Sequence, residues 1–216
     1  SMLSLVNISI ASILPAVVLG IVRWRHADRV YRPFFILLFI GVLNEVVSQC
    51  SIHYFHTNAL NSNIYVLVEA LLLLWQFQCW KLFYRTGVYT LIGGLLMAVW
   101  IGECFIFSGI RFFCSYYRIC YAFAVVLMSI LMVNRLIVNE YQPILKSSAF
   151  LICTGFIFYY TYQVLVEIFY LYGLSSSKAF GNSIYHILSY INIFTNLIYA
   201  IAILWMPRKR EFMLQL

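Results

Sequence analysis

The chain has 216 residues, of which 64% are hydrophobic and only 10% charged, whereas soluble domains carry about 25% charged residues. A soluble fold of this size could not bury so much apolar surface, so the composition excludes an ordinary water-soluble domain. The net charge of +7 is confined to short segments between apolar runs, which argues against nucleic-acid binding and indicates contact with the head groups of a lipid bilayer.

The apolar runs are continuous and long enough to cross a bilayer, which takes about 20 residues per helix. Transmembrane β-strands would instead be short and alternating. We therefore predict an all-α, multi-pass protein of the cell membrane, with a single seven-helix transmembrane domain over residues 1–216. The predicted spans, in chain order, are residues 3–22, 34–55, 63–83, 89–109, 114–137, 148–173 and 182–206.

Basic residues mark alternate connections between these spans. Four arginines between residues 23 and 32 follow the first span, and basic residues also follow the third, fifth and seventh. The opposite connections contain only Arg111 and Lys178. Because cytoplasmic loops are enriched in Lys and Arg, we expect the N-terminus outside and the C-terminus in the cytoplasm. No basic residue precedes the first span, so we expect a retained helix rather than a cleaved signal peptide.

A short similarity between the third and seventh spans suggests an internal duplication. Residues 63–67 read NIYVL and residues 183–187 read SIYHI, at an offset of 120 residues. The offset would make spans one to three and five to seven parallel repeats linked by the fourth span, as in some small transporters. Few letters match, so duplication and chance similarity both stay open.

In layout, the whole chain resembles 3+1+3 seven-helix membrane proteins, which include microbial rhodopsins, SWEET and PQ-loop sugar transporters and the KDEL receptor. The third span, with Ile64, Tyr65 and Glu69, also resembles an uncharacterised bacterial seven-helix family that carries Ile-Tyr-x-x-x-Glu there. These resemblances imply the fold and no particular activity. Rhodopsins need a Schiff-base lysine in the last helix, and residues 182–206 contain none, so we do not expect retinal as a cofactor.

Charged residues inside the predicted spans indicate where a site lies. A charge at the bilayer centre costs about 2.5–3.5 kcal/mol, so such groups face a protein interior or a watery cavity. Placed by helical spacing, the strong polar groups fall in the outer half of the bundle. The charged residues within spans are Glu45, Glu69, Glu103, Glu167 and Arg118.

These residues predict a polar cavity that opens to the outside. We expect its floor near the middle of the membrane, at Asn44, Glu45 and Asn192. Tyrosines near the outer ends of spans could add to its wall, namely Tyr116, Tyr117, Tyr159, Tyr160, Tyr162 and Tyr170. The predicted ligand-binding residues are Asn44, Glu45, Gln49, Glu69, Arg118, Gln163, Glu167 and His186.

Several of these residues have a plainer structural interpretation. Polar groups in membrane helices often only join helices, at about 0.6 kcal/mol per hydrogen bond, and Asn44 and Gln49 fit this as well as ligand binding. Glu103, near a span end, is expected to reach water, and Arg118 to pair with a glutamate. Most of the six cysteines should act as small apolar residues. Cys104 and Cys114 could form a disulfide if their loop faces an oxidising compartment.

A metal site is a further alternative. The candidate ligands His53, His186, Glu69 and Glu167 are of the types that hold a catalytic zinc. Seven-helix hydrolases of the ceramidase and progestin-receptor type carry His-x-x-x-His in the last helix, whereas the last span here has only His186.

We expect a membrane protein that binds a small molecule or lipid, as a transporter or a receptor. Only residues 207–216 follow the last predicted span, so we expect that a receptor would need a separate output protein. The alternatives are an intramembrane, metal-dependent hydrolase that acts on lipid, and a structural subunit whose polar core only joins helices.

Overall fold

The structure is a computed structural model that describes residues 8–107, 109–139, 144–173 and 178–207, with side chains except at residues 139, 178–182 and 185. The described residues form helices and contain no β-strand. The first helix covers Ile8–Arg23, and its regular part is α2 (Leu14–Arg23). The other elements are η1 (Arg29–Tyr31), α3 (Arg32–Phe55), α4 (Ala59–Cys79), α5 (Thr86–Ile101), η2 (Gly102–Phe107), α6 (Ser115–Asn139), η3 (Ile144–Lys146), α7 (Ser148–Leu171) and α8 (Lys178–Trp205).

Six of the predicted spans coincide with helices that are long and apolar enough to cross a membrane. With η2 counted as the continuation of α5, their observed ends lie at most four residues from the predicted ones. The first predicted span began at residue 3, so residues 3–7 of that prediction lie outside the described residues. The remainder forms a shorter apolar helix, Ile8–Arg23. The prediction of an all-helical chain with several membrane-length helices is confirmed.

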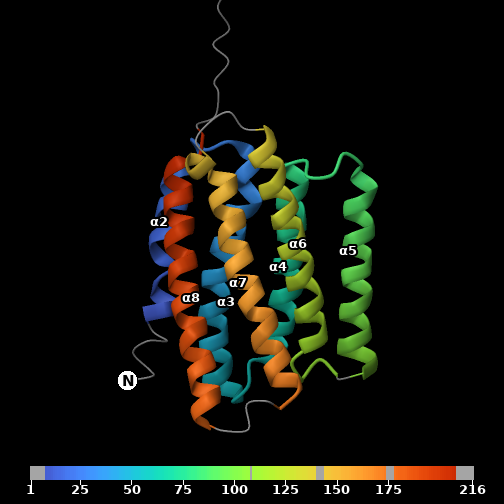
Figure 1. The fold of residues 1–216 in the computed structure, drawn as a ribbon. Coiled ribbons are helices and arrows are strands. Elements are labelled where there is room, and N and C mark those ends of the chain that lie inside the picture. Colours follow the sequence, from blue (N-terminus) through green and yellow to red (C-terminus); the bar gives the residue numbers. More distant parts are fainter. Residues whose placement is uncertain (1–7, 108, 140–143, 174–177, 208–216) are drawn as a thin grey trace, which may run out of the picture.

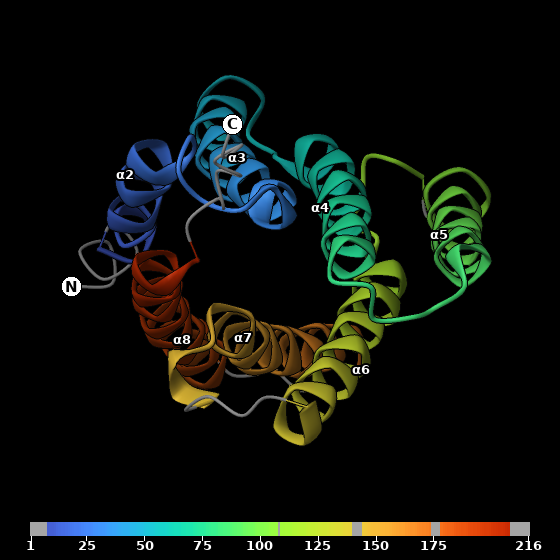
Figure 2. The ribbon, with the colours of Figure 1, turned by 90° about the horizontal axis from the view of Figure 1, so that it is seen from above.

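Six of the helices form a ring, and α5 stands outside it (Figures 1 and 2). Seen from above, the ring runs from α2 through α3, α4, α6, α7 and α8 (Figure 2). Each neighbouring pair in this order is in contact, including α2 with α8, which closes the ring. Because α5 packs against the outside of α4 and α6, the side chains that line the central cavity come from the other helices.

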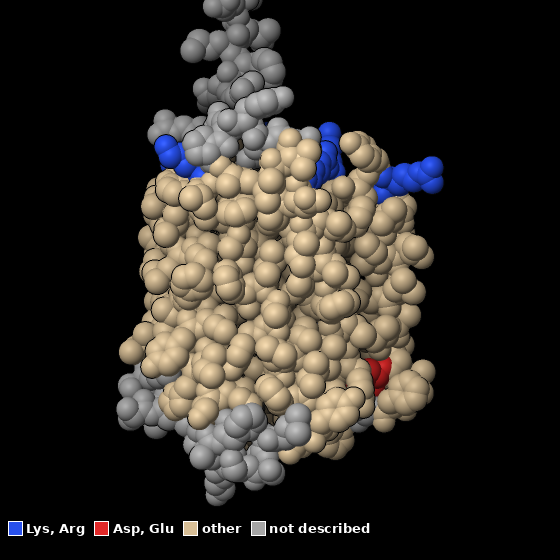
Figure 3. All heavy atoms as spheres, viewed as in Figure 1, with Lys and Arg blue, Asp and Glu red and all other residues tan. Residues whose placement is uncertain are grey.

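Basic side chains gather where α2, α4, α6 and α8 finish, which we call the basic end; the other is the opposite end (Figure 3). One guanidinium nitrogen of Arg23 donates to the carbonyl oxygens of Ile203 at 3.1 Å and Met206 at 3.0 Å. Arg135 donates likewise to the Lys81 carbonyl. Arginines thus bind the carbonyls at helix C-termini, where the macrodipole favours cations. The predicted basic residues 208–210 lie outside the described residues.

An aromatic layer fills the ring toward the basic end. Phe34, Phe77, Phe156 and Tyr199 lie with neighbouring ring centroids 5.2 to 6.3 Å apart, and three of these residues are no more than 2% exposed. Beside them, the amide of Gln76 accepts from the Phe34 N–H at 2.9 Å and donates to the Val30 carbonyl at 2.9 Å. This layer brings α3, α4, α7 and α8 together.

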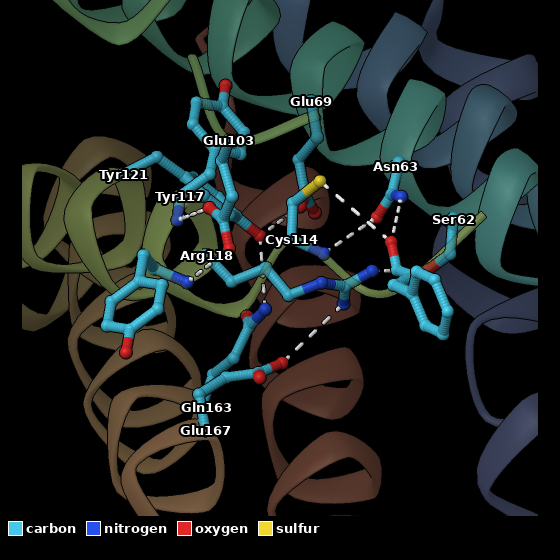
Figure 4. A network of polar contacts seen from close by, with 12 residues as sticks. Ser62, Asn63, Glu69, Glu103, Cys114, Tyr117, Arg118, Tyr121, Gln163 and Glu167 are labelled. Atoms are coloured by element: carbon cyan, nitrogen blue, oxygen red, sulfur yellow. Dashed lines mark hydrogen bonds and ion pairs between the residues drawn. The ribbon is translucent and has the colours of Figure 1, made fainter. Parts of the chain in front are cut away.

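The opposite end is held by Asn63, which is fully buried in α4. Its side-chain nitrogen donates to the carbonyl oxygens of Ile110 at 3.0 Å and Phe112 at 2.6 Å. Its side-chain oxygen accepts from the Cys114 N–H at 3.1 Å. One amide therefore holds residues 110–114, which lead into α6, against α4 (Figure 4).

Glu103 corrects a prediction, because it does not reach water but is only 5% exposed. Its carboxylate oxygens accept from the N–H groups of Tyr116 at 3.0 Å and Tyr117 at 2.5 Å, in the first turn of α6. The first N–H groups of a helix have no partner within it, and its N-terminus favours a negative charge. Glu103 is therefore the N-terminal cap of α6.

Next to this cap, Cys104 and Cys114 form a disulfide with their Cα atoms 6.3 Å apart. The bond joins the π-helical turn η2 to the start of α6. The sequence alone allowed a disulfide between these two cysteines but did not require one. Cys50, Cys79, Cys120 and Cys153 are free.

Loss of this disulfide is expected to lower the free energy of unfolding by about 2–3 kcal/mol, because the bond closes a loop across a separation of ten residues. The measurement is thermal unfolding of the purified protein in nanodiscs, for the double variant Cys104→Ser, Cys114→Ser against the native chain. Cys120→Ser, at an exposed free cysteine, serves as the matched control. A double variant that melts with the native protein would contradict this expectation.

Candidate functional site

A cavity of about 230 Å³ lies inside the ring. The first helix, α3, α4, α6, α7 and α8 all contribute to its wall, and α5 does not. Leu37, Leu38, Phe156 and Tyr199 line it toward the basic end, so it reaches deeper than the floor predicted at Asn44, Glu45 and Asn192. Its polar lining consists of Ser9, Asn44, Glu45, Ser62, Tyr65, Glu69, Arg118, Tyr121, Tyr159, Tyr160, Gln163, Asn192, Thr195, Asn196 and Tyr199.

Glu69 is the most buried carboxylate of the cavity wall, with 6% exposure. Its two oxygens accept hydrogen bonds from the hydroxyls of Tyr65 at 3.1 Å and Tyr121 at 2.7 Å. Gln163 then donates to the Tyr121 hydroxyl at 3.1 Å. Glu69 thereby links α4, α6 and α7 through tyrosines, and a side chain so placed both stiffens the wall and shapes its polarity (Figure 4).

Arg118 lies in the first turn of α6 and is the cation of the cavity wall. One terminal nitrogen donates to the Ser62 hydroxyl at 2.6 Å, and the other lies 3.7 Å from a Glu167 oxygen. Its guanidinium carbon lies 5.3 Å from the ring centre of Phe113. The predicted pairing of Arg118 with a glutamate is confirmed. Its Nε is buried and has no hydrogen-bond partner among the described residues.

Glu45 differs from the other three glutamates of the helices. It lines the cavity from α3, yet the described residues give its carboxylate no hydrogen bond and no ion pair. Its neighbour Asn44 accepts from the amide of Asn61 at 2.9 Å, and Asn61 also donates to Ser48 at 2.9 Å. Glu45 thus offers a carboxylate that the surrounding described residues leave unpaired.

α8 presents a polar stripe to the cavity and holds the first helix. The amide of Asn192 donates to the Ser9 hydroxyl at 3.0 Å, and the amide of Asn196 donates to the Ser12 hydroxyl at 2.8 Å. Thr195 lies between them, 1% exposed, and its hydroxyl has no partner among the described residues. The side-chain oxygen Oε1 of Gln163 likewise has no partner among the described residues. Thr195 and Gln163 thus each bring a free hydrogen-bonding group to the cavity wall.

A second hollow of about 280 Å³ adjoins the cavity and is lined by Phe113 of the η2–α6 connection, Glu167 and Tyr170 of α7, and Leu188 of α8. We call it the crevice. Arg118, Tyr159 and Gln163 line both the crevice and the cavity. The pair Arg118–Glu167 therefore lies between the cavity and the opposite end.

The structure brings together five of the eight predicted ligand-binding residues and separates three. Asn44, Glu45, Glu69, Arg118 and Gln163 line the cavity. Glu167 lines the crevice instead, because it lies one helical turn beyond Gln163, and Gln49 lines a groove on the outside of the ring, one turn beyond Glu45. Whether any of them binds a ligand stays a prediction.

His186 lines none of these hollows. It precedes Thr195 by nine residues, and at 3.6 residues per turn that places it on the opposite face of α8. The face of α8 that carries Asn192, Thr195 and Asn196 therefore lines the cavity without His186. The side chain of Asn182 lies outside the described ones.

The candidate metal ligands do not lie together at one site. His53 is exposed near the end of α3 and packs against the ring of Tyr54, with centroids 5.1 Å apart. Across residues 8–107, 109–139, 144–173 and 178–207, no group of three His, Cys, Asp or Glu is placed to hold a metal ion. Zinc-dependent hydrolysis stays a prediction without a ligand set in that part of the chain.

Sequence reasoning missed several cavity residues, among them Ser9, Ser62, Thr195 and Tyr199. Ser and Thr occur in apolar helices for many reasons, and nothing local marks these as cavity residues. Of the tyrosines expected at the cavity, Tyr159 and Tyr160 line it, Tyr170 lines the crevice and Tyr116 is exposed. Tyr162 instead donates to the Ile184 carbonyl at 3.1 Å and joins α7 to α8.

The described fold and hollows define a class: an all-helical bundle with membrane-length helices and a polar internal cavity. Comparisons with protein-family models, with curated proteins and with solved structures give no match. The site must therefore be interpreted from its own chemistry.

Proposed function

We propose that this chain is a multi-pass membrane protein that binds a small molecule in the cavity, as a transporter or a receptor. The observation that carries the proposal is the cavity itself, where charged and amide side chains from five apolar helices, α3, α4, α6, α7 and α8, face a common space. Charged and amide groups are costly at membrane depth unless they meet water, each other or a ligand. Helices that only needed joining would have these groups paired. Within the part of the chain that the structure describes, the Thr195 hydroxyl and Oε1 of Gln163 have no partner, and no hydrogen bond or ion pair involves the carboxylate of Glu45, which lines the cavity.

The size of the cavity limits the ligand. At about 230 Å³ it is smaller than the roughly 300–1,000 Å³ of pockets that enclose drug-sized molecules. The wall offers tyrosine hydroxyls, amides, one guanidinium and one unpaired carboxylate. A molecule the size of an amino acid or a monosaccharide fits both this volume and this mixture of donors and acceptors.

We further propose that the basic end is cytoplasmic and that the ligand enters from outside. The distribution of Lys and Arg over the connections supports this orientation. The aromatic layer of Phe34, Phe77, Phe156 and Tyr199 separates the cavity from the basic end, while the crevice adjoins it toward the opposite end. The position of α5 outside the ring also suits a 3+1+3 repeat, with three ring helices before it and three after it (Figure 2).

The test is ligand-dependent stability of the purified protein in nanodiscs. The probes are amino acids, monosaccharides and short dicarboxylates, each at about 10 mM. A probe at 100 times its dissociation constant adds about 2.7 kcal/mol, which raises the melting temperature by about 5–10 °C for a protein of this size. At least one probe class is expected to do so.

A pair of glycine variants makes the result specific to the cavity. Gly41 lines it, and a Cβ there would meet only the end of Ile13 at 3.4 Å and the Tyr65 hydroxyl at 3.8 Å, so Gly41→Leu should fold and fill the cavity. Gly94 on α5 has open space around it, so Gly94→Leu is the matched control. Stabilisation should disappear in Gly41→Leu and persist in Gly94→Leu.

Two results would contradict binding in the cavity and favour a structural subunit. In the first, a probe stabilises Gly41→Leu and Gly94→Leu equally. In the second, no probe class stabilises the native chain or either variant. Once a probe binds, its uptake into proteoliposomes separates the two forms of the proposal. Accumulation that Gly41→Leu abolishes indicates a transporter. Binding without uptake indicates a receptor.

A further inference from the structure

A lateral groove runs along the outside of the ring between the first helix and α3, with a volume of about 360 Å³. Its wall is apolar apart from one carboxylate and one amide. Ile10, Ala11 and Leu14 line it from the first helix, and Val42 and Val46 from α3, with Glu45 between those two and Gln49 one turn further on.

The lateral groove adjoins the cavity. Ile10, Ile13 and Glu45 line both hollows, so they form the partition between the inside of the ring and its outer surface. A molecule in the groove would therefore meet the Glu45 carboxylate from the outside, and the polar cavity lies directly behind that carboxylate.

The first helix is irregular beside this partition. Ser12 and Ile13 form a turn between Ile8–Ala11 and α2, and Pro15 follows within the first turn of α2. Proline cannot supply the N–H that a continuous helix would need here. Interrupted helices whose ends face a central site are a recurring feature of transporter binding sites.

The polar attachment of this segment is to α8 rather than to α3. Ser9 and Ser12 accept from Asn192 and Asn196, whereas the described residues show no hydrogen bond between the first helix and α3. One side of the first helix is thus fixed by amides, and the side facing the groove is held by apolar contacts alone.

Glu45 supplies a negative charge with which a positively charged ligand would pair. Glu69, Glu103 and Glu167 each have hydroxyl, N–H or guanidinium partners, and Glu45 has none among the described residues. A carboxylate at the boundary of an apolar groove is costly until a cation pairs with it. Charge complementarity therefore favours an ammonium group as the partner.

We propose that the lateral groove admits a long-chain primary amine from the bilayer, with its hydrocarbon chain between the first helix and α3 and its ammonium paired with Glu45. This inference rests on the proposed function, since the cavity behind Glu45 receives the polar head. It adds the chemical class of one ligand and a route of entry through the side of the bundle.

The test uses the protein in nanodiscs with three probes: n-decylamine, n-decanol and n-butylamine. n-Decylamine carries both the chain and the charge, n-decanol lacks the charge, and n-butylamine lacks the chain. Only n-decylamine is expected to raise the melting temperature, by about 5 °C or more at saturation. Glu45→Gln should abolish the shift, and Glu45→Asp, which keeps the charge, should retain most of it.

A second pair of variants tests the groove itself. Ala11 is an exposed residue of the groove wall, so Ala11→Phe should fill the groove and remove the n-decylamine shift. Ala98 is exposed on α5, outside the ring, and Ala98→Phe should leave the shift unchanged. Neither change touches the polar wall of the cavity.

Three outcomes would overturn the inference: stabilisation by n-decanol equal to that by n-decylamine, an n-decylamine shift that survives Glu45→Gln, or one that survives Ala11→Phe. If n-butylamine matches n-decylamine, the cation arrives through the cavity and lateral entry is wrong. These results are independent of the soluble-probe test with Gly41→Leu. Failure of the amine inference therefore leaves the proposed function standing. Failure of the soluble-probe test is recognised separately, from the Gly41→Leu and Gly94→Leu variants.

Discussion

Asn63→Leu is expected to lower the free energy of unfolding by about 3–5 kcal/mol, because three backbone groups lose their buried partner at once. Leucine has nearly the same shape but can neither donate nor accept. It would leave the carbonyls of Ile110 and Phe112 and the N–H of Cys114 without the partner they have now. A buried group that loses its partner costs about 1–3 kcal/mol.

The effect should extend to the site, because the connection that Asn63 holds leads directly into the first turn of α6. Arg118 lies in that turn and contacts Ser62, the residue before Asn63 in α4. We therefore expect Asn63→Leu to weaken binding of any probe that stabilises the native chain, although Asn63 does not line the cavity.

Asn134→Leu is the matched control, because Asn134 is exposed in α6 and no hydrogen bond within the described residues involves its side chain. Thermal unfolding in nanodiscs should show a change of less than about 0.5 kcal/mol for this control. If Asn63→Leu is no less stable than Asn134→Leu, the connection is held by the disulfide and by packing rather than by the amide.

The importance of Asn63 was hidden by one predicted boundary. With the third span starting at residue 63, Asn63 would lie at the membrane surface and bond to water. The helix starts at Ala59, four residues earlier, which places Asn63 one turn inside the bundle. Helix ends depend on tertiary contacts as well as on local sequence, so the error of one turn changed the expected environment of the residue completely.

The helices themselves could be predicted because a bilayer dictates their length and composition. Within them, spacing along α4, α6 and α7 correctly put Glu69, Arg118 and Gln163 at a shared depth. Spacing alone could not assign partners. Glu103 is a cap of α6 because a π-helical turn and a disulfide bring it beneath that helix, and neither contact has a local signature in the sequence.

Tyr199 and Thr195 show a second limit. Tyrosine near a span end is typical of the membrane interface, so Tyr199 gave no sign of being buried in the interior. It lies there because α7 carries Gly155 opposite to it, and a contact between two separate helices leaves no periodic pattern in either one. Sequence reasoning placed both Asn192 and His186 at the cavity, and of these two the structure puts only Asn192 at its wall.

Gly155→Val is the second large effect we expect, because it acts on stability and binding together. A Cβ on Gly155 would lie 2.5 Å from the ring of Tyr199 and 3.3 Å from the methyl group of Thr195. Both residues line the cavity, and Tyr199 packs in the aromatic layer against Phe34 and Phe156. Overpacking of this kind costs about 1–3 kcal/mol and at times more, and valine adds two further methyl groups to the conflict.

The ring of Tyr199 can move away from valine only toward the cavity, or by separating α7 from α8. The first movement fills the binding space, and the second breaks the wall that holds Thr195. Either way, the melting-temperature shift given by a soluble probe should disappear in Gly155→Val, together with a loss of at least about 3 kcal/mol of stability. Gly94→Val, with open space around the glycine, should leave both quantities unchanged.

A double-mutant cycle identifies Tyr199 as the cause. Tyr199→Ala alone removes a buried ring and should itself cost about 3–5 kcal/mol. If the conflict between residues 155 and 199 is real, valine partly fills the space that the ring vacates, and the double variant is more stable than the sum of the two single changes predicts by at least about 1 kcal/mol. Strictly additive losses would mean that the close approach of α7 and α8 does not depend on this pair, and the aromatic layer would then need another explanation for its position beneath the cavity.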